Sequence, residues 1–110
     1  MKTRMQYDRG RSLQGVKRGL MKYRLLQARA MGAREAGDLT RANRLTELAN
    51  LERAALIVRL EALEDERVRS VMSMRYLHGL PWDEIAEQMF FSLRWVMKLH
   101  KRGLCELMGG

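Results

Sequence analysis

The segment LPWDEIAEQMFFSLRWVMKLHKR, residues 80–102, decides the fold of this chain. All of its acidic residues lie in the first half, and its second half contains only basic ones. Pro81 suits the first turn of a helix, and the two acids that follow Trp82 lie at the positive end of that helix's dipole. Ser92 suits the N-cap of the next helix. The segment therefore predicts a short helix over residues 82–89, a turn, and a last helix over 93–107.

The last helix has two unlike faces when its residues are placed at about 100° per residue. One face is apolar or small, and it consists of Val96, Leu99, Gly103 and Leu107. The opposite face is basic and consists of Arg94, Lys98 and Lys101. Trp95 and Arg102 flank the basic face on one shoulder and Met97 flanks it on the other. We expect the apolar face to pack on neighbouring helices, with close approach at Gly103.

A basic face of this kind is what a recognition helix needs in the major groove of DNA. Arg and Lys reach phosphates and guanine edges from one side of a rigid cylinder that fits the groove. The acids at the start of the preceding helix then stay away from phosphate, which explains the charge boundary. The alternative is an ordinary solvated face, because basic ridges are common on small proteins.

The rest of the chain predicts three further helices. A first helix over residues 13–31 follows from the apolar spacing of Leu13, Val16, Leu20 and Tyr23. The glycine-containing stretch 31–38 predicts a turn, with Asp38 as the N-cap of a second helix over 39–63. A third helix should start near Asp65 and end at Gly79 in a left-handed conformation. We expect the first dozen residues of the chain to be loose.

The second helix is apolar on more than one side. One stripe consists of Leu45, Leu48, Leu51, Ala55 and Val58, and it is widened by Leu56, Ile57, Leu60 and Leu63. A helix that is apolar on two sides needs more than one neighbour. We expect the first helix to fold back on it as a hairpin, and a second chain to be able to pack there as well.

The charge distribution points to a polyanionic partner. The 110 residues carry a formal net charge of +8, with the N-terminal end strongly basic and the middle of the chain richer in acids. Clustered positive charge of this kind favours nucleic acid as a partner. The alternative is that the basic first segment packs beside the acidic middle segment, and the two interpretations are compatible.

The run from Arg75 to Leu107 resembles the helix-turn-helix of sigma-70 region 4, as in phage-encoded transcription regulators of the ArpU and RinA type. The positions that carry the resemblance are Arg75, Tyr76, Gly79, Trp82, Glu84, Ile85, Ala86, Ser92, Lys101, Arg102, Gly103 and Leu104. It covers about residues 65–108. Two positions depart from the family pattern: Phe90 stands where a Gly or Asn is usual in the turn, and Gly103 replaces an Ala.

The resemblance implies a set of DNA contacts on the last helix. Arg94, Trp95, Lys98 and Lys101 would contact bases or backbone, Ser92 would cap the helix near a phosphate, and Arg102 would hold phosphate. A left-handed Phe90 costs roughly 1 kcal/mol or more, so either the turn differs or Phe90 packs well enough to offset that cost.

Other chemistry finds little support in the sequence. The single Cys105 excludes an internal disulfide framework, and His78 and His100 are not at metal-ligand spacing. We recognise no catalytic constellation, no phosphate-binding loop and no cofactor motif. We therefore expect no catalytic activity. No apolar run reaches transmembrane length, so we expect a cytoplasmic protein without membrane contact.

Taken together, these patterns predict an all-α protein. Residues 1–64 would form a basic segment and helical hairpin for oligomerisation or partner contact, and residues 65–110 a three-helix DNA-binding module. The expected function is sequence-specific binding of double-stranded DNA for transcription regulation in a phage or prophage setting, by a homodimer or higher homo-oligomer, with RNA polymerase as a further partner. Two rivals remain: a DNA-packaging adaptor of the small terminase class, and a helical module that binds only RNA polymerase.

Overall fold

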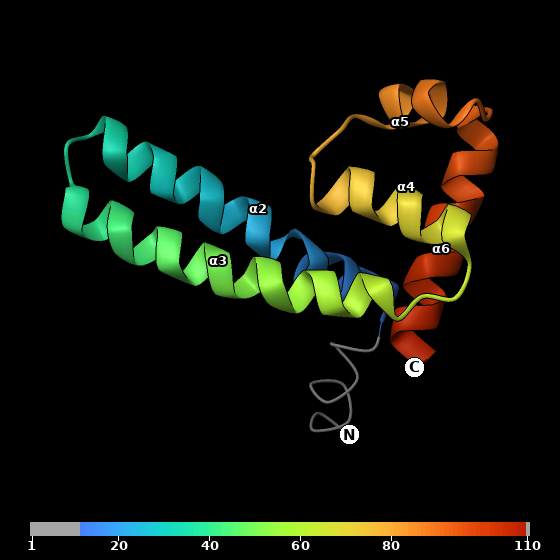
Figure 1. Cartoon of the computed structure of the whole chain (residues 1–110), viewed down its shortest axis with the longest axis horizontal. Helices are drawn as coiled ribbons and strands as arrows, with labels where there is room; N and C mark the ends of the chain where they lie inside the picture. Colours follow the sequence, from blue (N-terminus) through green and yellow to red (C-terminus); the bar gives the residue numbers. More distant parts are fainter. Residues whose placement is uncertain (1–11, 110) are drawn as a thin grey trace.

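The computed structural model describes residues 12–109, and these form five α-helices without any strand. The helices are α2 (Leu13–Glu35), α3 (Leu39–Glu61), α4 (Glu66–Tyr76), α5 (Trp82–Met89) and α6 (Leu93–Gly109). Helices α2 and α3 form a long hairpin, and α4 to α6 form a compact group at one end of it (Figure 1). The predicted all-α fold with a hairpin and a helix-turn-helix is confirmed. The expectation that the first residues are loose concerns residues 1–11, which lie outside the described residues.

The hairpin turn is shorter than the sequence predicted. Helix α2 continues to Glu35, and the connection is reduced to residues 36–38, with Gly37 at a φ of 81°. The longer helix forms because residues 31–35 are mostly good helix formers and because Ala33 is buried against the partner helix. Asp38 caps α3 as predicted, since its Oδ1 accepts a hydrogen bond from the backbone N–H of Arg41 at 3.1 Å.

Small side chains bring the two hairpin helices together. The buried positions of α3 are Ala42, Ala49, Leu56 and Leu60, and those of α2 are Val16, Leu20, Tyr23, Ala30 and Ala33. The stripe expected on α3 faces the other way, because Leu48, Leu51 and Val58 are 44%, 70% and 69% exposed. The hairpin covers only the second apolar side of α3 and leaves the predicted stripe open to solvent.

One ion pair between described residues joins the basic first helix to the second. The Nζ of Lys22 lies 3.2 Å from Oε1 of Glu52. The interpretation of the basic charge as packing on the middle segment therefore holds for Lys22, whereas Arg18 and Arg29 on α2 form no ion pair with another described residue.

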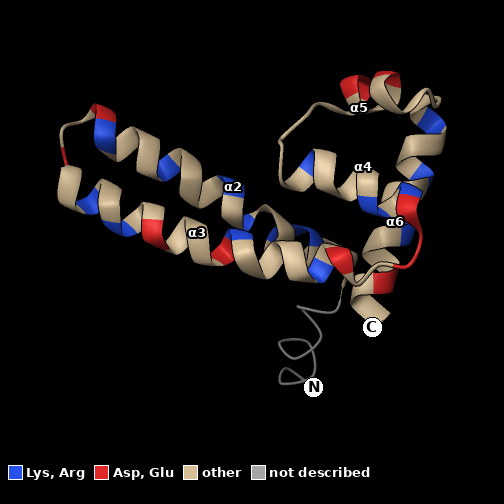
Figure 2. Cartoon of the chain, viewed as in Figure 1, with Lys and Arg blue, Asp and Glu red and all other residues tan. Residues whose placement is uncertain are grey.

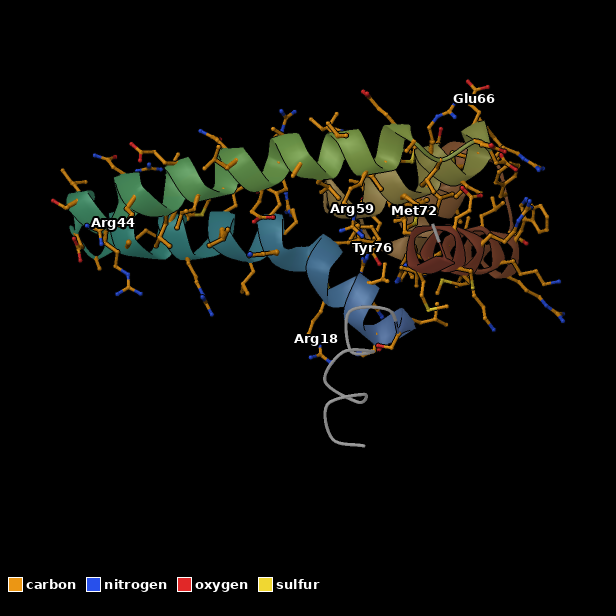
Figure 3. All side chains as sticks on the ribbon, turned by 90° about the horizontal axis from the view of Figure 1, so that it is seen from below. Arg18, Arg44, Arg59, Glu66, Met72 and Tyr76 are labelled. Carbon is orange, nitrogen blue, oxygen red and sulfur yellow. The ribbon has the colours of Figure 1, made fainter. Side chains whose placement is uncertain are left out.

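The core is continuous between the hairpin and the three following helices. Leu20 and Tyr23 of α2 share one buried cluster with Met72 and Tyr76 of α4, which are labelled at this junction in Figure 3. The guanidinium of Arg69 adds a polar tie by donating to the backbone carbonyls of Leu63 and Glu64 where α3 ends. The domain boundary predicted at residue 64 remains a prediction and lies in the connection between α3 and α4.

Two left-handed residues separate the last three helices. Gly79 has a φ of 67°, and the N–H of Leu80 donates to the carbonyl of Met74 at 3.0 Å, which closes the end of α4 as predicted. Phe90 follows α5 with a φ of 58° and a ψ of 37°. The turn therefore keeps the left-handed geometry that a Gly or Asn would favour, although the side chain of Phe90 is 94% exposed. Both alternatives expected for Phe90, a different turn and compensating packing, are therefore wrong.

Candidate nucleic-acid interface

Helix α6 presents the expected basic face. Ser92 caps it, because its Oγ accepts a hydrogen bond from the backbone N–H of Trp95 at 3.1 Å. Val96 and Leu99 on the inner face are completely buried. Arg94, Lys98 and Lys101 are exposed on the opposite face, and none of the three forms an ion pair with another described residue. Three cations are thus held on one side of a rigid helix and remain available to a partner.

Gly103 allows the inner face of α6 to approach α4 closely. A Cβ on Gly103 would lie 2.9 Å from Sδ of Met72 and 3.0 Å from Cγ1 of Val68, both of which are buried side chains. The close approach predicted at this residue is confirmed. It fixes α6 against α4 and so sets the direction in which the basic face points.

Trp95 forms one shoulder of the basic face together with a residue that the sequence did not reveal. The Cζ of Arg67, from α4, lies 5.7 Å from the centre of the Trp95 ring. Arg67 contributes only because α4 and α6 pack side by side, so no spacing within one helix could have predicted it. A shallow hollow lies along this shoulder between Trp95, Lys98 and Arg102.

Asp65 organises the cations on the Trp95 shoulder. It caps α4 by accepting from the N–H of Arg67 at 2.8 Å, and its Oδ2 lies 3.1 Å from the Arg67 guanidinium. These bonds lower the pKa of Asp65 to about 2. The same oxygen lies 3.7 Å from Nη2 of Arg102. The predicted phosphate-binding Arg102 is therefore loosely tethered, while its side chain stays 54% exposed.

The other shoulder of α6 is apolar. Leu93 and Met97 lie one turn apart on α6 and are 49% and 39% exposed, and Phe90 in the preceding turn is 94% exposed. We call these three residues the apolar shoulder. Met97 was expected on this shoulder, whereas the exposed apolar side chains of Phe90 and Leu93 were not, although large apolar side chains beside a predicted basic face are a visible signal.

The acids of the charge boundary lie on a different helix from the basic face. Figure 2 shows acidic residues on α5 and basic residues along α6. Ile85 and Ala86 are buried in the core cluster that also contains Val96 and Leu99, so α5 packs on the inner side of α6 as expected. Asp83 and Glu84 remain exposed in the first turn of α5. The opposite charges are thus separated by the helix crossing.

An aromatic cluster behind α6 accounts for several residues of the family pattern. Nε2 of His100 lies 2.6 Å from the hydroxyl of Tyr76, and the rings of His100 and Trp82 meet edge to face with centroids 4.5 Å apart. The Arg75 guanidinium stacks over Trp82 at 4.5 Å and donates to the carbonyl of Leu80 at 3.1 Å. His100 is therefore a buried packing residue.

Burial shifts both titrating groups of this cluster away from their charged forms. It lowers the pKa of His100 to about 4, and the positive charges of Lys17 and Arg75 act in the same direction. It also raises the pKa of Tyr76 to about 12. The pair is therefore neutral at physiological pH and stabilises the position of α6.

Comparison with protein families agrees with this geometry. Residues 59–107 match the family model for Sigma-70, region 4. The module is a sigma-70 region 4-like helix-turn-helix. Sigma-70 region 4 is a family of DNA-binding domains rather than of enzymes. Neither the curated proteins nor the solved structures that were compared gave a match.

The sigma-70 region 4-like match begins before the predicted module. It includes the last turn of α3 as well as α4, α5 and α6. Within residues 12–109, no helix is long and apolar enough to cross a membrane. The same described residues contain no cluster of His, Cys, Asp or Glu suited to a metal ion. Cys105 is exposed with a free thiol.

Proposed function

We propose that this protein is a sequence-specific transcription regulator that inserts α6 into the major groove of double-stranded DNA. The observation that carries the proposal is the exposed row of Arg94, Lys98 and Lys101 on a helix whose other face is buried. Ser92, Trp95 and Arg102 complete the proposed contact surface, with Ser92 and Arg102 near phosphates and Trp95 beside the groove. An α-helix fits the major groove, where Arg and Lys reach guanine edges and phosphates.

The apolar shoulder fits the same groove. Thymine is the only DNA base that presents a methyl group there, and apolar side chains read it by contact. Leu93 and Met97 lie beside Arg94 and Lys98 on successive turns of α6. We therefore assign mixed recognition to this face, in which cations hold phosphate and guanine while Leu93 and Met97 favour thymine.

Alanine substitutions on the basic face test the proposal. Arg94→Ala and Lys98→Ala should each cost about 1–3 kcal/mol of binding free energy and lower the salt slope by about one. Arg53→Ala is the matched control, because Arg53 is an exposed base on α3 away from α6. Fluorescence anisotropy with a duplex selected from a random pool, repeated at several salt concentrations, measures both quantities. Equal affinities for all three variants and the parent would contradict the proposal.

Replacing thymine by deoxyuridine tests the apolar shoulder. This change removes the methyl group without altering the hydrogen-bonding edge of the base. The parent protein should bind the substituted duplex several-fold more weakly, while Leu93→Ala together with Met97→Ala should bind both duplexes alike. If the double variant still lost the same affinity when thymine was replaced by deoxyuridine, the thymine contacts would lie elsewhere.

The hairpin supplies the remaining part of the proposed function. We assign to residues 1–64 the assembly of a homodimer, because one module reads too few base pairs for strong specificity. A contact with RNA polymerase, a place in the cytoplasm of the host cell and a phage or prophage origin belong to the same proposal. They rest on the resemblance to phage-encoded regulators.

A further inference from the structure

Helix α3 carries an uncovered apolar row on the side away from α2. The row consists of Leu48, Leu51, Ala55, Val58 and Ala62, and we call it the outer seam of α3. Its members are separated by three, four, three and four residues. Leu51 and Val58 at its centre are 70% and 69% exposed, whereas Ala49, Leu56 and Leu60 on the other face are buried. Within residues 12–109, this second face of α3 is therefore left exposed along its length.

The spacing of the outer seam is that of a two-stranded coiled coil. Alternating steps of three and four residues average 3.5, which keeps the row facing a partner helix along its whole length. Isolated exposed apolar residues are common, but a contiguous row of Leu and Val is typical of an interaction surface. We propose that a second copy of this chain covers it, with α3 packed antiparallel on α3 of the partner about a two-fold axis near residue 53.

The charges at the two ends of the row decide the direction. Arg44 continues the row four residues before Leu48 and lies towards the free end of the hairpin (Figure 3). A parallel pair would place Arg44 against Arg44 of the partner subunit, and such like charges repel. The antiparallel pair instead places Arg44 beside Glu61 of the partner subunit.

The side chains along the row fit the same arrangement. With the axis near residue 53, Leu48 meets Val58 of the partner subunit, and Leu51 meets Ala55 of the partner subunit. Each large side chain then faces a smaller one, as in interdigitated helix packing. Arg44 and Glu61 are both exposed, and neither forms an ion pair within residues 12–109, so both are available to the partner.

Because the seam is self-complementary, its contact joins two subunits and stops there. An isologous contact about a two-fold axis uses the same surface on both copies and leaves none of it free. Helix α2 also has outward apolar residues, Met21 and Leu25, which are 48% and 51% exposed. Packing of that side on α3 of another copy would be heterologous and would build rings or filaments. A dimer therefore separates this proposal from a ring-forming packaging adaptor.

This inference rests on the homodimer of the proposed function and names the surface that makes it. DNA binding by α6 is measured separately, so the two can fail independently. Helix α6 stands at the end of the molecule away from the hairpin turn (Figure 1). A dimer that does not bind DNA would overturn the proposed function alone, and a monomer that binds DNA would overturn this inference alone.

Mass measurement with matched variants tests the surface. Light scattering on the full chain at about 100 μM should give twice the mass of one chain. Leu51→Glu together with Val58→Glu should give the mass of one chain with unchanged far-ultraviolet circular dichroism, because both positions are exposed. Leu25→Glu is the control on α2 and should stay dimeric. A monomeric parent, a ring, or dissociation by Leu25→Glu rather than by the α3 variants would overturn the proposal.

Disulfide trapping tests the direction in a Cys105→Ser background. Residues 48 and 58 are about 15 Å apart along a helix. In an antiparallel pair, neither Leu48→Cys nor Val58→Cys should cross-link alone, whereas a mixture of the two should yield a cross-linked heterodimer. Efficient cross-linking of either variant with itself would show a parallel pair and overturn the arrangement.

Discussion

His100 makes the stability of this protein sensitive to mild acid. Burial lowers its pKa in the folded chain to about 4, against about 6.5 in the unfolded chain. The unfolded state then binds more protons between these two values, so the folded state is most stable above pH 6.5 and loses stability as the pH falls towards 4. The loss amounts to about 3 kcal/mol, because each unit of pKa difference corresponds to about 1.4 kcal/mol.

Denaturant titrations between pH 7 and 4 measure this loss. In His100→Gln the fall between pH 6.5 and 4 should largely disappear, because the substituted side chain does not titrate. The pKa of Asp65 lies at about 2, below its ordinary value, so its contribution is lost at lower pH, as the pH falls from about 4 towards 2. A parent protein whose stability is flat from pH 6.5 to 4.5 would contradict the assignment.

Phe90 is strained in the turn of the helix-turn-helix. Its φ of 58° is unfavourable for a side chain with a Cβ, and its 94% exposure provides no compensating burial. Phe90→Gly should therefore raise the free energy of unfolding by roughly 1 kcal/mol. Phe91→Gly is the matched control and should lower it, because Phe91 is half-buried against the core. Thermal melts of both variants decide the matter, and a destabilised Phe90→Gly would show that Phe90 has packing partners.

At the level of the elements, Gly103 is the position where α4 and α6 touch. A Val side chain there would collide with Met72 and Val68, so Gly103→Val should cost roughly 1–3 kcal/mol. Adding Met72→Ala makes room for the new side chain. The double variant should therefore lose less stability than the sum of the two single losses, as measured by urea unfolding. Strict additivity would mean that the crossing adjusts without strain at this position.

Most elements could be predicted from the sequence because their ends carry local signals. Ser92, Asp38 and Gly79 act through their own side chain or backbone and therefore mark helix ends wherever the chain packs. The end of α2 was placed too early, since Gly32 reads as a breaker but is tolerated inside a helix that packs on α3. Likewise, the sequence showed two apolar sides on α3 but did not show which of them would pack against α2.

In the candidate site, too, the features set within one helix could be predicted, and those set by packing between helices could not. The basic face of α6 lies within one helix, so helical periodicity was enough to predict that Arg94, Lys98 and Lys101 share a side. Arg67 and Asp65 come from another helix and its cap, and only the packing of α4 on α6 brings them to Trp95 and Arg102. Contacts between helices depend on the crossing, which spacing along the chain does not encode.

For the whole molecule, the shared core couples the hairpin to the helix-turn-helix. Leu20 of α2 is completely buried in the same cluster as Met72, Val96 and Leu99. Opening the module without the hairpin would expose apolar surface of both, which costs about 25 cal/mol for each Å². We therefore expect the described residues to unfold in one cooperative step, so that residues 12–64 and 65–109 act as parts of one folding unit.

Two optical probes test this coupling. Both are recorded at the same protein concentration, so that any dimerisation affects the two melting curves equally. Trp82 and Trp95 are the only tryptophans, so fluorescence reports on the module, whereas circular dichroism at 222 nm reports on all helices. The two melting curves should coincide. Leu20→Ala should shift both by the same amount, at a cost of about 2–5 kcal/mol, although Leu20 belongs to the hairpin. Leu25→Ala, at an exposed position of the same helix, should shift neither appreciably. A fluorescence transition that stays in place in Leu20→Ala would instead mean that the sigma-70 region 4-like module folds alone and that residue 64 separates two independent units.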